Sequence, residues 1–266
     1  MSAFSLKIIA LAAMLIDHVG AVFPGAPFEF RLIGRLTFPI FVYLIAEGFR
    51  HTRSPEKFLL RLLAFAIISE PFYDWSMNRA HNIRYGLSPW HVDFLSRTNV
   101  FYTLLLGGLS IFVFRYVYNA FTQGINSGIN PEASTAQRRE AYLAVGAVTA
   151  LFTLGFMWVA DALGTDFGGF GVLFILLMYV VKPAPKWLRL TVMATMCVLL
   201  HRWVFQGLWH GTPLPDGFYW FFPATLLSVL LVALYSGKRG PSLKWLFYIS
   251  YPAHLAILAV LAWVLL

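Results

Sequence analysis

The sequence predicts an all-α polytopic membrane protein with about nine transmembrane helices (nine or ten) and a cytoplasmic N-terminus. Of its 266 residues, 59% are hydrophobic and only 12% are charged, about half the charge expected of a soluble chain. The hydrophobic residues form long runs that short polar stretches separate, which is typical of polytopic membrane proteins. Nine Trp and twelve Tyr residues suit a chain anchored at lipid headgroups. We expect one integral-membrane domain over residues 1–266.

The individual spans follow from apolar runs close to the roughly 20 residues that a bilayer-crossing helix needs. The predicted spans are 6–23, 33–50, 57–75, 99–119, 141–161, 168–182, 187–206, 218–236 and 244–266. The second and sixth are short or interrupted, which leaves the count at nine or ten. Residues 120–140 are polar and rich in Gly, Asn and Ser, so they predict a flexible cytoplasmic loop.

The orientation follows from the positive-inside rule, which places Lys and Arg on the cytoplasmic side. With the N-terminus inside, fourteen of the twenty Lys and Arg residues fall on that side. They are Lys7, Arg50, Arg53, Lys57, Arg61, Arg115, Arg138, Arg139, Lys182, Lys186, Arg189, Lys238, Arg239 and Lys244. Most acids and histidines fall on the outer side. Residues 1–23 also have the length of a signal peptide, but an acid and an imidazole inside the apolar core are unusual there.

Two classes of site are disfavoured by the composition. The net charge of +8 is spread over loops instead of forming one patch, so we expect no nucleic-acid partner. Cys197 is the single cysteine, which excludes a disulfide within the chain and a cysteine zinc site. We infer no metal.

The first span contains the adjacent pair Asp17 and His18, which are costly at bilayer depth and often mark function. On a helix they point about 100° apart. One interpretation is structural, with Asp17 paired to Arg35 and the histidine satisfied locally. The other makes His18 a general base, for which imidazole is well suited. Lys7 lies three turns before His18 on the same face, about 16 Å away, and is either a snorkelling lysine or part of a path for a donor.

Three further residues are candidates. Glu70 precedes Pro71, which loosens the third span. Asp166 lies in a glycine-rich turn, where a helix start explains it as well as a function does. His254 follows Pro252 inside the last span, which suggests a polar interior site or its support.

At the outer start of the second span, Arg35 is either an interface anchor or part of the site. Glu47 precedes a basic cluster that includes Arg50 and Arg53, so an ion pair at the inner surface explains it as well as a role in donor binding does.

Six strings of this chain resemble the TraX family, the conjugal-transfer pilin acetylases. The two terminal blocks are the most specific, and the matching strings are Leu6–His18, Ile33–Phe41, Glu47–Arg53, Leu60–Phe72, Asn99–Leu104 and Tyr248–Leu255. The family often has Ala-Asp-Tyr-Gly where this chain has Thr165-Asp166-Phe167-Gly168. A wider kinship with integral-membrane acyltransferases implies an essential early histidine, here His18, with a basic residue eleven positions before it. That residue is usually arginine, and Lys7 lacks its bidentate fork.

The resemblance implies a multi-pass enzyme of the bacterial inner membrane that transfers an acetyl group from cytoplasmic acetyl-CoA to an outer acceptor, either a pilin or an envelope glycan. The expected catalytic residues are His18, Asp17, Arg35, Glu70, Asp166 and His254. The expected donor-binding residues are Lys7, Glu47, Arg50, Arg53, Lys57 and Arg61, because guanidinium and ammonium groups hold the phosphates of CoA. His18 acts as a base or carries the acetyl group covalently.

Three alternatives remain. An O-acetyltransferase of an envelope glycan or lipid has the same chemistry with another acceptor. A secondary transporter or permease uses similar acids and histidines but predicts repeated halves with matched broken helices, which the sequence lacks. A structural scaffold of a secretion complex needs no charged residues within its spans.

Overall fold

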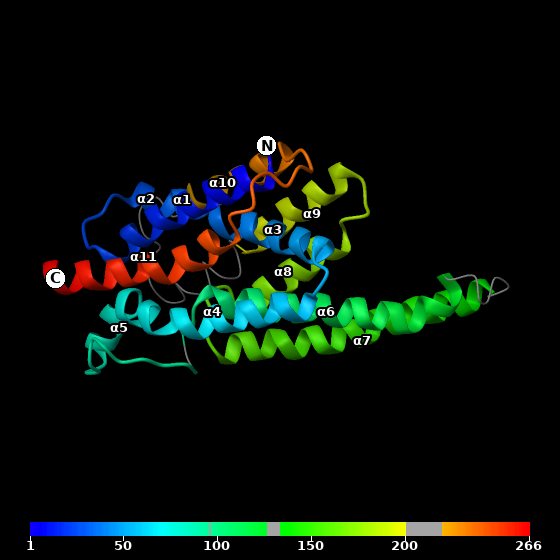
Figure 1. Cartoon of the computed structure of the whole chain (residues 1–266), viewed down its shortest axis with the longest axis horizontal. Helices are drawn as coiled ribbons and strands as arrows, with labels where there is room; N and C mark the ends of the chain where they lie inside the picture. Colours follow the sequence, from blue (N-terminus) through cyan, green and yellow to red (C-terminus); the bar gives the residue numbers. More distant parts are fainter. Residues whose placement is uncertain (96, 127–133, 201–219) are drawn as a thin grey trace.

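In a computed structural model, the chain is a bundle of α-helices (Figure 1). The structure describes residues 1–95, 97–126, 134–200 and 220–266. The helices are α1 (Ala3–Val22), α2 (Phe28–Gly34), α3 (Thr37–His51), α4 (Pro55–Ser76), α5 (Arg79–Arg84), α6 (Val100–Asn126), α7 (Thr135–Ala162), α8 (Gly168–Val180), α9 (Lys186–Leu200), α10 (Phe221–Ala233) and α11 (Lys244–Leu265). These described ranges contain no strand, which confirms the all-α prediction.

Each of the nine predicted spans coincides with one long or medium helix, while α2 and α5 are short additional helices. Among the residues that the structure describes, five segments are both long and apolar enough to cross a bilayer, namely Ala3–Val22, Phe28–His51, Val100–Thr122, Thr135–Ala162 and Trp245–Leu265. Helix α4 has 22 residues but carries charges along its length. Helices α8 and α10 have 13 residues each and reach only about 20 Å. The number of crossings and the cytoplasmic N-terminus therefore stay predictions, and parts of the predicted spans 187–206 and 218–236 lie outside the described residues.

The interruption expected in the second span is present. Helix α2 ends at Gly34 and α3 begins at Thr37, so Arg35 lies in the turn that joins them. The loop predicted at 120–140 is shorter than expected, because α6 continues to Asn126 and α7 begins at Thr135. Ser134 and Gln137 form a capping box at the start of α7, which satisfies two orphan backbone donors.

The core is apolar and draws on most of the helices. Close packing is visible where α6 meets α8, since a Cβ added at Gly107 would lie 2.5 Å from Ile175 Cδ1. Helices α1 and α3 run antiparallel, and the Thr37 hydroxyl donates to the Ala10 carbonyl over 3.3 Å. Segments far apart in sequence are thereby fixed in one bundle.

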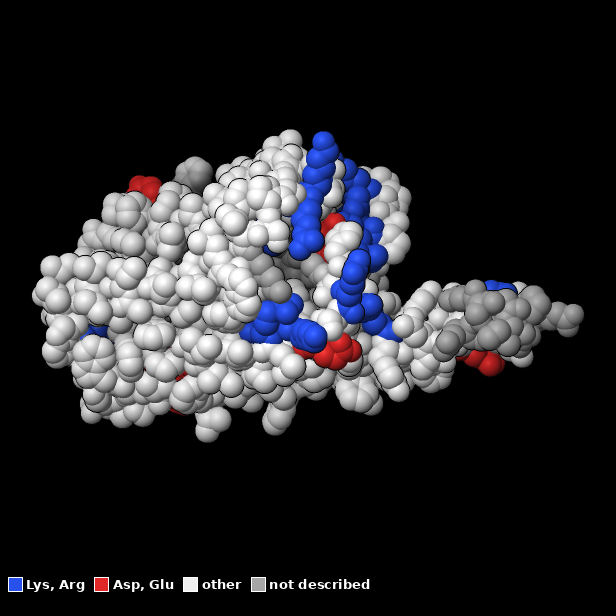
Figure 2. Space-filling view, viewed as in Figure 1, with Lys and Arg blue, Asp and Glu red and all other residues white. Residues whose placement is uncertain are grey.

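The bundle has two chemically different ends. Helices α2 and α5 and the C-terminus lie at one end, and the α6–α7 hairpin projects at the other (Figure 1). Lys and Arg side chains form a band across the molecule on the hairpin side of its body (Figure 2). We call the end that carries the α3–α4 and α8–α9 turns the basic end, and the end that carries α2 and α5 the opposite end.

Candidate active site

Two histidines from the first and last helices meet in the half of the bundle that carries α2 and α5, away from the basic end. His18 Nδ1 on α1 lies 2.6 Å from His254 Nε2 on α11, and the two rings stack with centroids 4.9 Å apart. The Tyr251 ring meets both edge-on, at 6.0 Å from His18 and 5.4 Å from His254. The two histidines that the sequence singled out therefore form one unit.

The hydrogen bonds of this pair determine where the protons lie when both rings are neutral. His254 Nδ1 is 2.7 Å from the Ser250 carbonyl, which can only accept, so Nδ1 carries a proton. His254 Nε2 is then an acceptor, and His18 Nδ1 must donate to it. His18 Nε2 is left with a lone pair and has no hydrogen-bond partner among the described residues. That nitrogen is available to take a proton or to attack a carbonyl carbon.

Asp17 points away from this pair and holds α2 against α1. Its Oδ1 pairs with Arg31 Nη1 at 2.9 Å and with Arg35 Nη2 at 3.0 Å, and the side chains of Asp17 and Arg35 are 14% and 9% exposed. The approach depends on Gly34, because a Cβ there would lie 2.1 Å from Asp17 Oδ1. The expected salt bridge between Asp17 and Arg35 is present, and Arg31 is a partner that sequence reasoning missed.

The two other predicted acids, Asp166 and Glu70, are also held by polar side chains. The Tyr73 hydroxyl donates to Asp166 Oδ1 over 2.6 Å. Glu70 is fully buried and accepts from the backbone and side-chain amides of Asn99, while its Oε1 has no partner among the described residues. Asn99 also caps α6 by accepting from the Phe101 amide. Sequence reasoning missed Tyr73 and Asn99, although an Asn before a hydrophobic run is a signal for a helix start.

Electrostatic interactions link these groups into one site. Asp166 interacts with Asp17, Arg31 and Arg35, and Tyr251 interacts with both Asp166 and Glu70. Five predicted catalytic residues, at positions 17, 18, 35, 166 and 254, thus lie in one polar cluster, with Glu70 coupled to it. We call this the histidine site.

Asp166 lies in the turn between α7 and α8, and burial raises the pKa of its carboxyl from the ordinary 3.8 to about 6. The folded chain therefore holds a proton there that the unfolded chain has lost, and stability falls as pH rises through roughly 4 to 6. Asparagine keeps an oxygen for Tyr73 but carries no charge. As pH rises from 5 to 8, we expect the free energy of unfolding of Asp166→Asn to increase relative to that of wild type by roughly 1–1.5 kcal/mol.

Thermal unfolding of the purified variants at both pH values measures this difference. Glu29→Gln, which removes an exposed carboxyl on α2, is the matched control and should follow wild type at each pH. If the difference in thermal stability between Asp166→Asn and wild type does not change with pH, the raised pKa of the Asp166 carboxyl is wrong.

The predicted donor-binding residues lie toward the basic end, but they do not converge on one point. The Lys7 ammonium lies 5.2 Å from the Phe247 ring centroid. The Arg50 guanidinium donates to the Tyr179 carbonyl over 2.7 Å, and Arg61 lies over Phe58. Arg53 and Lys57 are exposed.

Glu47 does form an ion pair, but with residues other than its basic neighbours Arg50 and Arg53. Its Oε2 accepts from the Lys182 ammonium, and its Oε1 lies 3.2 Å from His51 Nε2 and 3.3 Å from the Tyr235 hydroxyl. Lys182 follows α8 and Tyr235 follows α10, so Glu47 ties three segments together.

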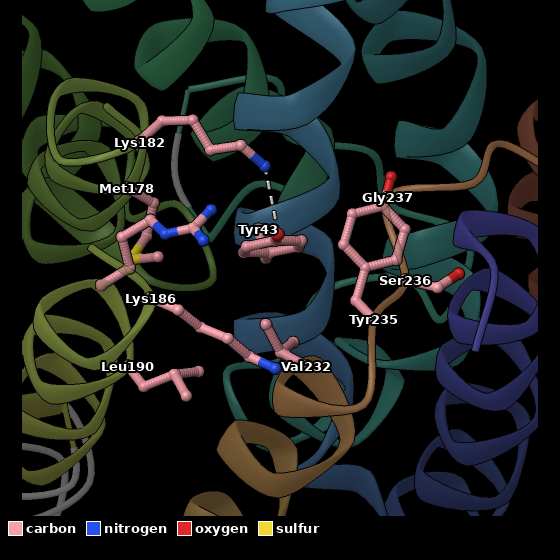
Figure 3. A pocket seen from close by; sticks show the side chains of 10 residues that line it. Tyr43, Met178, Lys182, Lys186, Leu190, Val232, Tyr235, Ser236 and Gly237 are labelled. Carbon is pink, nitrogen blue, oxygen red and sulfur yellow. Dashed lines mark hydrogen bonds between the residues drawn. The ribbon is translucent and has the colours of Figure 1, made fainter. Parts of the chain in front are cut away.

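A pocket opens beside this ion pair (Figure 3). It has a volume of about 250 Å³ and is bounded by α3, the start of α9 and the end of α10. Its lining includes three cations, Lys182, Lys186 and Arg189, and two tyrosines, Tyr43 and Tyr235. Sequence reasoning placed the three cations on the cytoplasmic side but did not identify them as a site, because nothing local indicates that they face one cavity.

The chain is similar to one protein family and to one known protein over nearly its whole length. A family model described as "TraX protein" matches residues 2–262. The chain is also 30% identical over 271 residues to a Dichelobacter nodosus protein described as "Probable fimbrial assembly protein FimC, serogroup H1", an alignment that covers 97% of this chain and 94% of that protein. No solved structure matches the chain significantly.

Proposed function

Because the chain belongs to the TraX family, we propose that it is a membrane-embedded acetyltransferase. It moves an acetyl group from acetyl-CoA on the cytoplasmic side of the bacterial inner membrane to an acceptor on the outer side. We favour the N-terminal amine of a pilin as the acceptor. The relative described as a probable fimbrial assembly protein supports an acceptor that belongs to a surface fibre.

The observation that carries this proposal is that His18 Nε2, at the end of a hydrogen-bonded chain from Ser250 through His254, has no hydrogen-bond partner among the residues that the structure describes. As the acceptor nitrogen attacks the thioester carbonyl, His18 Nε2 takes a proton from that nitrogen. The new C–N bond forms, the C–S bond breaks, and the CoA thiolate leaves with the electron pair and takes the proton back from the His18 imidazolium, which restores the base. The imidazolium of His18 keeps its bond to His254, because Nδ1–H still donates to Nε2.

The surrounding charges have distinct roles in this scheme. Asp17, Arg31 and Arg35 hold α1 and α2 in register beside the reactive ring. Asp166 favours a cationic acceptor, since a carboxylate attracts an ammonium group before that group loses its proton. Arg35 and Asp17 are positioning residues in this view, and His18 is the catalytic residue.

Transfer across the membrane is the direct test. Labelled acetyl-CoA is sealed inside membrane vesicles whose cytoplasmic face is inward, and a pilin N-terminal peptide is added outside. We expect label on the peptide's α-amine, and none in vesicles that lack the chain. Absence of label from every outer acceptor would refute the proposal, while label on an envelope glycan or lipid in place of the peptide would support the O-acetyltransferase alternative.

A further inference from the structure

The pocket at the basic end combines cations that have too few anionic partners. Lys182 pairs with Glu47. Within the described part of the chain, neither Lys186 nor Arg189 lies within ion-pair distance of a carboxylate. Arg189 is half-buried, and its Nε is buried with no hydrogen-bond partner among the described residues. A buried donor of this kind calls for a partner, and the described residues supply none.

The remaining walls of the pocket are aromatic. The rings of Tyr43 and Tyr235 meet edge-to-face with centroids 5.6 Å apart, and Arg189 interacts electrostatically with Tyr43. Figure 3 shows the two tyrosine rings beside each other, with Lys182 reaching the Tyr43 hydroxyl and the Lys186 ammonium reaching Val232 on the opposite side. Cations beside flat rings suit a ligand with both phosphate and purine groups.

The position of the pocket also fits a long ligand. Thr37 lies beside Ala10, and Tyr43 is six residues further along the antiparallel α3, so it lies about 9 Å closer to the start of α1 than Ala10 does. His18 lies eight residues from Ala10 in the other direction, about 12 Å away. The pocket and the histidine site are therefore separated by about 21 Å along the bundle, a span on the scale of an extended pantetheine arm.

We infer that the pocket bounded by Lys182, Lys186 and Arg189 binds the phosphate groups of a purine nucleotide. This rests on the proposed function, in which that nucleotide is the adenosine 3′,5′-bisphosphate portion of the acetyl-CoA donor. Arg189 and Lys186 contact the phosphates, while the Glu47–Lys182 pair holds the mouth of the pocket in place. The cations at Arg53 and Lys57 then lie outside the phosphate site.

Binding measurements test the inference without requiring catalysis. The full chain in phosphatidylcholine nanodiscs is titrated calorimetrically with adenosine 3′,5′-bisphosphate, and adenosine serves as the phosphate-free probe. We expect Arg189→Gln and Lys186→Gln each to weaken nucleotide binding about tenfold or more, the effect of losing one charge-assisted contact. Arg139→Gln removes an exposed arginine of α7 and should bind as wild type does. Arg189→Lys keeps the charge and should bind with intermediate affinity, and thermal unfolding verifies that each variant is folded.

Several results would overturn the inference. Equal affinity in wild type and Arg189→Gln would do so, as would a loss confined to Arg53→Gln. If only an anionic lipid such as phosphatidylglycerol binds in an Arg189-dependent manner, the pocket recognises a headgroup and the nucleotide assignment is wrong. Acetyl transfer with an unchanged KM in Arg189→Gln would remove this inference and leave the proposed function intact. Arg189-dependent nucleotide binding without acetyl transfer would refute the proposed function and leave the nucleotide-binding pocket intact.

Discussion

Replacing His18 with alanine is expected to lower acetyl transfer about 10²–10⁴-fold, the usual contribution of a positioned general base. The reason is geometric, since His18 Nε2 ends the hydrogen-bonded chain through His254 to Ser250 and meets no further partner in the described part of the chain. The vesicle assay with labelled acetyl-CoA measures the loss. Thermal unfolding of the same preparation separates it from a folding defect, because the variant leaves the core contacts of α1 in place.

His91→Ala is the matched control, because it removes an exposed histidine from the segment between α5 and α6. It should transfer acetyl groups at the wild-type rate. If His18→Ala and His91→Ala label an outer acceptor equally, His18 is not the reactive group. Mixing wild type with labelled donor in the absence of acceptor then separates two mechanisms, because a base retains no label on the chain whereas an acetyl-histidine does.

Most of the fold was predictable because hydrophobic runs of bilayer length leave few alternatives to helices. The short helices α2 and α5 were not predicted, since seven and six residues are too few to show a period. The ends of the 120–140 segment were also misjudged as loop. At the start of α7 the polar residues of Ser134–Glu140 are mostly exposed, and a polar composition alone does not distinguish the exposed surface of a helix from a loop.

The site was predictable residue by residue but not as an arrangement. Asp17 and Arg35 are 18 positions apart and of opposite charge, so their salt bridge could be expected. The contact between His18 and His254 joins the first and last helices, and no local pattern specifies which helices of a bundle are neighbours. The basic pocket was missed for the same reason, since Tyr235 comes to Glu47 and Lys182 only through the packing of α10 beside α3.

The second large effect concerns His254, which acts through His18 instead of touching the acceptor. His254 Nε2 accepts the hydrogen bond from His18 Nδ1–H and so keeps the proton of His18 on Nδ1. The Nε2 atom of His18 then carries no proton. His254→Phe keeps an aromatic ring of similar size in α11 but removes this acceptor. We expect acetyl transfer to fall about 10–100-fold, the range typical of groups that orient a reactive histidine. His254→Gln places a carbonyl oxygen near the former Nε2 and should recover part of the loss.

If His254 served only to pack against its neighbours, the variants would behave differently from what control of the His18 tautomer predicts. Loss of packing would lower thermal stability, and glutamine, which is the poorer steric match, would be worse than phenylalanine. Control of the tautomer predicts the opposite order in activity and a spectroscopic change that packing does not produce. In ¹⁵N spectra of histidine-labelled protein, the His18 signals should show a protonated Nδ1 in wild type and His254→Gln, and a population protonated at Nε2 in His254→Phe. Identical His18 signals in all three proteins would exclude this role, because the same ring nitrogen of His18 would then carry the proton whether or not His254 is present.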